Sequence, residues 1–462
     1  MPRPAASSTA VVAAAAAMAA VFLYTGVTRD AEYRRLVAAG DEALVRDQVF
    51  LALEAFSGAI ALKSESMLAY LKRGETYHRR GELSAALRDL SRARALAPEA
   101  TRPLELLGDV AQALGRHEEA AGYYAAYVAL DDRTPRVLYK QALANHRVGR
   151  TMRAIPLLRQ VVELAPAMSE AHYLLGIGLW DQHELDGAID ALREAVALSP
   201  GVATAREALS GVFAAAGQLN RQVEQLEALA ALEPDRADRD VDLGLAYAAV
   251  GRTDMAVLRL GRAAEEHPEQ PLVYAALGTV WLDIARTTND HIAVGKALGA
   301  LQSIPVATAS SATLTLLARA LLLTGDPEAA VTALERATER FLVDPSAFVE
   351  LADLVEDEGD DARTRRLLIA HDTLMVNAPV AQRVARLTRV ADLSLTLGDP
   401  DDAVVRFGLA RALGEPSARL LVRLADAEWR AGDRAAARAV IADGMEMYPQ
   451  DRYLLTLRRR FE

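Results

Sequence analysis

Small and apolar residues recur along the chain in a register of 34 residues. The register begins at Tyr33 and continues unbroken through starts at 67, 101, 135, 169, 203, 237 and 271. It resumes at 311, 345, 384 and 418, which gives twelve units. Self-similarity at a fixed period is typical of repeat architectures, in which each unit buries its apolar face against its neighbours.

Four positions of each unit predict a helix–turn–helix. Position 8 is always small: Gly40, Gly74, Gly108, Ala142, Gly176, Ser210, Gly244, Gly278, Ala318, Ala352, Ala391 and Ala425. Position 15 is mostly glycine, which tolerates the positive φ of a chain leaving a helix. Position 20 is mostly alanine, and position 32 is often proline, which ends the second helix. We expect large residues at position 24, such as Leu260, to fill the gap between units.

This pattern resembles the tetratricopeptide repeat family over residues 33–451. The resemblance implies an all-α fold, a right-handed superhelix of about twelve helix–turn–helix units. It further implies that positions 2, 5, 6, 9, 12 and 13 of each first helix line a concave surface, and we call this set of positions the groove face.

The composition of the chain limits the classes of fold and function that it can have. Aromatic residues make up 5% of a chain that is 52% hydrophobic, which favours helices over sheets. The formal net charge of −11 argues against a nucleic-acid binder. Because cysteine is absent, disulfides, thiolate metal sites and a cysteine nucleophile are excluded.

An uncharged run from Ala10 to Val27 predicts a membrane segment. At about 1.5 Å per residue its 18 residues approach the thickness of a bilayer core. We expect a tail at 1–9 and a single-pass anchor at 10–28 in the inner (cytoplasmic) membrane. A cleaved signal peptide or a buried helix is the alternative reading. The side on which the body lies stays open, because the flanking arginines and the short tail point in opposite directions.

Interruptions of the register divide the body. We expect units 1–8 over 33–304, an irregular linker over 305–310, units 9–12 over 311–451 and a polar cap over 452–462. The linker and the extra stretch around Pro379 are either hinges or loops without effect on curvature.

The sequence lacks the common motifs of catalytic and nucleotide-binding sites. The sequence has no P-loop, dinucleotide fingerprint, nucleophile elbow or zinc-protease motif. None of the eight histidines has another at i+3 or i+4, the spacing that places two ligands on one helix face. The acidic run from Glu356 to Asp361 reads best as a solvated turn. We therefore expect no enzyme activity, no metal and no cofactor.

The groove face offers the candidate binding residues. Units two to four bring cations to it, and unit five turns it apolar. The candidates are Lys72, Arg79, Arg102, Arg136, Lys140, Arg147, Tyr173 and Trp180. Converging cations attract acidic peptides or other anions, and a buried tryptophan often anchors a partner. An ordinary solvated face and core packing are the alternative readings.

The leading hypothesis is a bacterial-type, membrane-tethered scaffold that holds a protein or peptide segment in its groove. The alternative is an envelope component for polysaccharide export that binds an anionic polymer there. Two known activities of similar proteins are disfavoured. The chaperone-tail carboxylate clamp needs a groove asparagine, which units two to four lack. Membrane-anchored lipopolysaccharide-assembly regulators carry a cysteine metal knuckle, and this chain has no cysteine.

Overall fold

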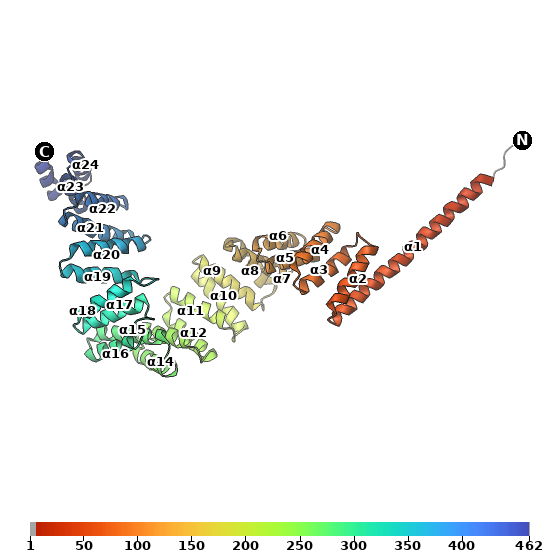
Figure 1. The fold of residues 1–462 in the computed structure, drawn as a ribbon, viewed down its shortest axis with the longest axis horizontal. Coiled ribbons are helices and arrows are strands. Elements are labelled where there is room, and N and C mark those ends of the chain that lie inside the picture. Colours follow the sequence, from red (N-terminus) through yellow and green to blue (C-terminus); the bar gives the residue numbers. More distant parts are fainter. Residues whose placement is uncertain (1–5, 462) are drawn as a thin grey trace. The chain divides into compact units, whose positions relative to one another are not determined.

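The computed structural model describes residues 6–461, apart from the side chains of residues 6–12, 19–23 and 25. These residues form 25 helices and no strand, and successive helices pair as helix–turn–helix units (Figure 1). The chain divides into two compact units between Leu232 and Glu233.

The first unit holds α1 to α12. Their bounds are α1 (Ala6–Val45), α2 (Val49–Leu62), α3 (Met67–Arg79), α4 (Leu83–Leu96), α5 (Thr101–Ala113), α6 (His117–Val128), α7 (Pro135–Arg147), α8 (Thr151–Leu164), α9 (Ser169–Asp181), α10 (Leu185–Leu198), α11 (Ala203–Ala215) and α12 (Leu219–Leu232).

The second unit holds α13 to α25. Their bounds are α13 (Ala237–Ala249), α14 (Thr253–Glu266), α15 (Pro271–Thr288), α16 (His291–Gln302), α17 (Ser311–Leu323), α18 (Pro327–Thr338), α19 (Pro345–Asp357), α20 (Asp361–Leu374), α21 (Val380–Thr396), α22 (Pro400–Ala412), α23 (Ala418–Ala431), α24 (Arg434–Met447) and α25 (Arg452–Phe461).

The predicted helix–turn–helix register is confirmed. Ten of the twelve predicted unit starts, from Met67 to Ala418, are the first residues of helices. Position 15 explains the turns, because all nine glycines there, from Gly81 to Gly432, have positive φ. Asp47 and His183 hold the same position in their units and adopt φ of 59° and 62° without the freedom of glycine.

The small residue at position 8 lets the two helices of a unit touch. A Cβ added to Gly244 would lie 2.5 Å from Leu260 Cγ, and one added to Gly176 would lie 2.5 Å from Leu192 Cγ. Both leucines stand at position 24 of the same unit and are fully buried. The expectation that position 24 fills the gap between units is therefore corrected, since these side chains fill the space between the two helices of one unit.

The interruptions of the register lengthen two first helices. A regular first helix such as α17 has 13 residues, whereas α15 has 18 and α21 has 17. In α15 the extra turn ends at Asn289 in left-handed conformation. In α21 the extra turn precedes the expected start, and Pro379 is its N-cap. The predicted linker 305–310 lies in the connection between α16 and α17.

The C-terminal segment 452–461 forms α25, which packs on α23 and α24. Its Leu454 and Phe461 are buried, and the Phe461 ring stacks on Trp429 with ring centroids 4.1 Å apart. The last repeat thus has its apolar end covered.

The predicted tail and anchor lie at the start of the chain. Residues 1–5 are outside the described part, and the anchor range 10–28 falls within α1, where several side chains are not described. Among the described residues, no helix combines the length and apolar character that crossing a membrane requires. The membrane segment at 10–28 stays a prediction.

Candidate groove-face binding site

The candidate cations of the first unit all stand on first helices, but most are already paired. Lys72 binds Asp41 at 2.8 Å, and Arg79 binds Asp47 at 2.8 Å. In both pairs the carboxylate comes from the preceding repeat. Arg147 is exposed and forms no ion pair with a described residue.

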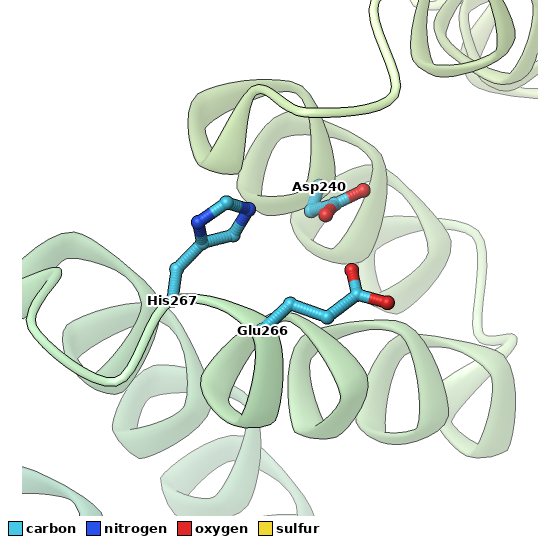
Figure 2. Close-up of side chains that lie close together, drawn as sticks. All are labelled: Asp240, Glu266 and His267. Carbon is cyan, nitrogen blue, oxygen red and sulfur yellow. The ribbon is translucent and has the colours of Figure 1, made fainter.

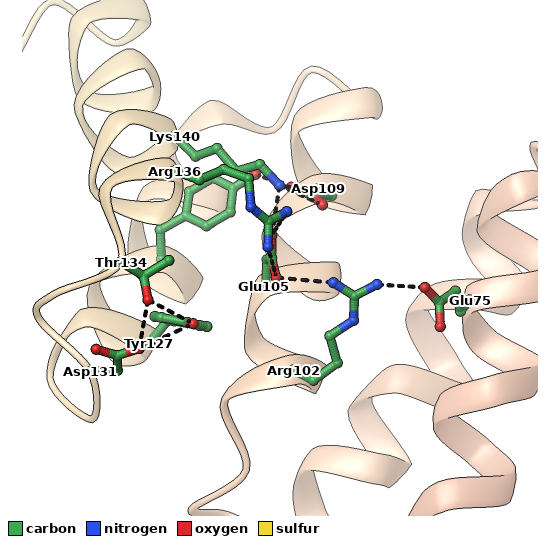
Figure 3. A network of polar contacts seen from close by, with 10 residues as sticks. Glu75, Arg102, Glu105, Asp109, Tyr127, Asp131, Thr134, Arg136 and Lys140 are labelled. Atoms are coloured by element: carbon green, nitrogen blue, oxygen red, sulfur yellow. Dashed lines mark hydrogen bonds and ion pairs between the residues drawn. The ribbon is translucent and has the colours of Figure 1, made fainter. Parts of the chain in front are cut away.

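Three further candidates converge on one buried carboxylate, Glu105 of α5 (Figure 3). Its side chain is 3% exposed and pairs with Arg102 of its own helix and with Arg136 and Lys140 of α7. Burial alone would raise the pKa of Glu105, but the hydrogen bond from Lys140 and the three positive charges lower it. The carboxylate is therefore held ionised.

The same network continues on both sides of Glu105 (Figure 3). Arg102 also binds Glu75 of α3 at 2.5 Å, and Lys140 Nζ lies 2.7 Å from Asp109 Oδ1. Asp109 accepts a further hydrogen bond from the Tyr124 hydroxyl at 2.7 Å. Burial and the neighbouring Asp109 raise the pKa of Tyr124. Three cations thus face three carboxylates, and little positive charge is left for an anionic ligand.

The two aromatic candidates of α9 are half-buried and pack against the hydrophobic core of the first unit. Trp180 also covers the next repeat, because a Cβ added to Gly211 of α11 would lie 2.7 Å from Trp180 Cη2. Trp180 therefore contributes to the contact between two repeats, and Tyr173 contributes to the packing of the core.

An opening on the groove face lies in the second unit, which holds none of the eight candidate binding residues. A pocket of about 650 Å³ is formed by α13, α15, α17 and the first half of α19. Leu245, Leu322 and Leu323 line it and keep 37%, 36% and 44% of their surfaces exposed. Its lining residues include positions 9, 12 and 13 of three consecutive units.

The apolar character of this part of the groove face can be read from the repeat register. Position 12 carries Ala248, Leu282 and Leu322 in consecutive units, a stripe of apolar residues on a face that is polar in units two to four. The extra turn of α15 adds Arg286 to the wall, and no spacing rule for regular units places that residue there.

Charged groups gather at the α19 side of this pocket. Arg319 of α17 binds Glu350 of α19 at 2.6 Å, and both residues line the pocket. One turn further along α19, Asp353 and Glu356 share a single cation, Arg389 of α21. The hydrogen bonds to these carboxylates raise the pKa of Arg389 against the opposing effect of its burial.

A separate group of possible metal ligands lies near the end of α14 (Figure 2). Ligand atoms of Asp240, Glu266 and His267 lie within 4.8 Å of one another. Asp240 already pairs with Arg259, and Glu266 pairs with Arg262 at 2.7 Å. The spacing rule for paired histidines does not identify this group, because it holds one histidine and its two carboxylates lie on α13 and α14.

Comparison with known proteins supports the repeat assignment. A family model described as tetratricopeptide repeat matches residues 71–136, 139–203, 173–240 and 315–364. The chain contains tetratricopeptide repeats at these residues. The fold, with its helix–turn–helix pairs in a regular register, agrees with this family. No curated protein matches the sequence.

Solved structures give weaker likenesses, each with a TM-score below 0.5. MamA from Desulfovibrio magneticus is 24% identical, covers 37% of this chain and 96% of its own, and has a TM-score of 0.36. YrrB, described as having an unusual peptide-binding site, is 23% identical, covers 40% and 95%, and has a TM-score of 0.38. Yeast Tom70 is 15% identical, covers 88% and 97%, and has a TM-score of 0.42. These likenesses do not bear on what the chain binds.

Proposed function

We propose that this protein is a non-enzymatic scaffold that binds a segment of a partner protein in the pocket on α13, α15, α17 and α19. One observation carries the proposal: a pocket of about 650 Å³ with exposed leucines lies on the groove face of consecutive repeats. Ligand sites are typically concave and mostly apolar with a few polar groups. Tetratricopeptide repeats usually serve protein–protein interaction rather than catalysis.

Selection from a display library of random short peptides tests this proposal. Leu322→Glu places a charge in the pocket, and Leu258→Glu is the matched control, because Leu258 is exposed on α14 outside the pocket. We expect peptides enriched on the wild-type protein to bind the control equally and to lose binding to Leu322→Glu. If the same peptides bind Leu322→Glu unchanged, the partner site lies elsewhere.

The anionic-polymer alternative receives less support. Lys72, Arg79, Arg102, Arg136 and Lys140 all form ion pairs with carboxylates. An anionic polymer would have to displace these carboxylates, and desolvating Glu105 without its cations is costly.

The proposal includes a membrane tether formed by residues 10–28 in the inner membrane. It rests on the uncharged run of 18 residues between Ala10 and Val27. Deleting residues 10–28 should release the protein from carbonate-washed membranes, whereas the full chain stays bound. Protease treatment of spheroplasts then reports the side of the body. If the full chain is itself extracted by carbonate, the tether is wrong.

A further inference from the structure

The pocket and the helix beside it differ in character along the groove face. On the α13, α15 and α17 side, leucine and alanine dominate the lining, with Leu245, Leu316 and Leu323 among them. On α19 the groove-face positions 6, 9, 12 and 13 are all acidic. They are Glu350, Asp353, Glu356 and Asp357.

The ion pairs neutralise only half of these acidic groups. Arg319 is engaged by Glu350, and Arg389 is shared between Asp353 and Glu356. Asp357 is exposed and forms no ion pair with any residue that the structure describes. Four carboxylates therefore share two guanidinium groups, so α19 carries surplus negative charge beyond Glu350, which is its one residue in the pocket lining.

On the apolar side the charges offset each other. Asp283 and Arg286 both line the pocket from α15 and stand three residues apart, one helical turn. A ligand over α13 to α17 thus meets a mostly apolar surface on which Asp283 offsets Arg286, whereas a ligand that extends past the pocket along α19 meets surplus negative charge.

We infer that the segment bound in this pocket is apolar and basic, with its apolar side chains over α13, α15 and α17 and its basic side chains beside α19. The inference rests on the proposed function and specifies the chemistry of the partner. An acidic segment would meet unpaired Asp357 and the shared carboxylates, and such like-charge contacts are the usual means of rejecting wrong partners.

Four fluorescent peptides of about four helical turns test this inference on the full chain by anisotropy. Three carry leucine at every third or fourth position, with lysine, glutamine or glutamate between. The fourth replaces the leucines of the lysine peptide by serine and controls for nonspecific attraction to an acidic protein. We expect the leucine–lysine peptide to bind most tightly and to weaken as salt is added.

A double variant locates the charge that matters. Asp353→Asn with Asp357→Asn removes the surplus and leaves Glu350 with Arg319 and Glu356 with Arg389. We expect it to weaken the leucine–lysine peptide about three- to tenfold, as for two exposed charge contacts, and to leave the leucine–glutamine peptide unchanged. Glu265→Gln with Glu269→Gln removes two exposed charges outside the pocket and is the matched control.

The outcomes separate the two proposals. If the glutamine or glutamate peptide binds as tightly as the lysine peptide, or if the control variant weakens the lysine peptide equally, the inference is overturned while pocket binding stands. If none of the leucine peptides binds, or if Leu322→Glu leaves their binding unchanged, the proposed binding site itself fails. Binding of the serine–lysine peptide as tight as that of the leucine–lysine peptide overturns the apolar half of the inference.

Discussion

Lys140 and Asp109 join consecutive repeats through a fixed pair of positions. Lys140 Nζ lies 2.7 Å from Asp109 Oδ1, and the two residues are position 6 of one unit and position 9 of the preceding one. Lys72 and Asp41 repeat this relation at 2.8 Å. Arg423 and Asp392 stand at the same two positions and also form an ion pair. The spacing of 31 residues thus sets a recurring ion pair across the groove face, and it neutralises cations that would otherwise attract ligands.

Replacing Lys140 by methionine should destabilise the interface of α5 and α7. The change leaves Glu105, which is 3% exposed, and Asp109 without a shared cation, at a cost of about 1–3 kcal/mol. Faster hydrogen exchange in α5 and α7 would report the loss. Arg147→Met is the matched control on the same helix, and we expect it within about 0.5 kcal/mol of wild type. Equal effects of both changes would contradict a structural role for the ion pair.

Gly244→Leu should separate the helices of the seventh unit. An added Cβ would lie 2.5 Å from Leu260 Cγ, so the larger side chain forces α13 and α14 apart, at about 1–3 kcal/mol. The measurement is urea unfolding followed by circular dichroism. Gly261→Ala is the control, because nothing lies within 4 Å of its added Cβ and alanine favours a helix. A neutral Gly244→Leu would show that the assigned contact is wrong.

His183→Gly should stabilise the fifth unit. His183 adopts φ of 62° at the position where nine other units have glycine, and a left-handed conformation is unfavourable for a side chain with a Cβ. We expect a gain of about 0.5–1 kcal/mol, measured as slower hydrogen exchange in α9 and α10. The reverse change Gly217→His should lose a similar amount. Destabilisation by His183→Gly would mean that the imidazole makes compensating contacts.

The sequence predicted the fold more fully than the site. Gly244, Gly217 and Pro234 stand where backbone geometry allows few residues, so single positions define the register and the ends of helices. The net charge of the groove face depends instead on which residues pair with each other in space. Lys140 reads as a free cation until Asp109, 31 residues earlier, is known to face it. One lining residue of the pocket, Arg286, likewise comes from the extra turn of α15, which a regular repeat does not contain.

Removing residues 452–462 should promote self-association. In the intact protein Phe461 stacks on Trp429, and Leu454 is fully buried against the last repeat. Without α25, this apolar surface meets water and favours contact with a second copy. Light scattering should show a concentration-dependent rise in mass. Arg459→Ser retains α25, and we expect it to have the mass of the wild type. If the truncated chain also keeps that mass, α25 does not act as a cap.

The free energy of unfolding should decrease as the pH falls below about 6.5, because His371 takes up a proton less readily in the folded protein than in the unfolded chain. Burial first, and then the charge of Arg386, lower the pKa of His371, while the carboxylate of Asp372 opposes them. Since the unfolded chain takes up this proton at its ordinary pKa of 6.5, before the folded chain does, the full stabilisation is present above that pH. It is lost as the pH falls toward the lower folded pKa. His371→Gln cannot take up the proton, so its melting temperature should change less than that of wild type between about pH 7.5 and 5.5. Parallel pH profiles of the two proteins would exclude His371 as the titrating group.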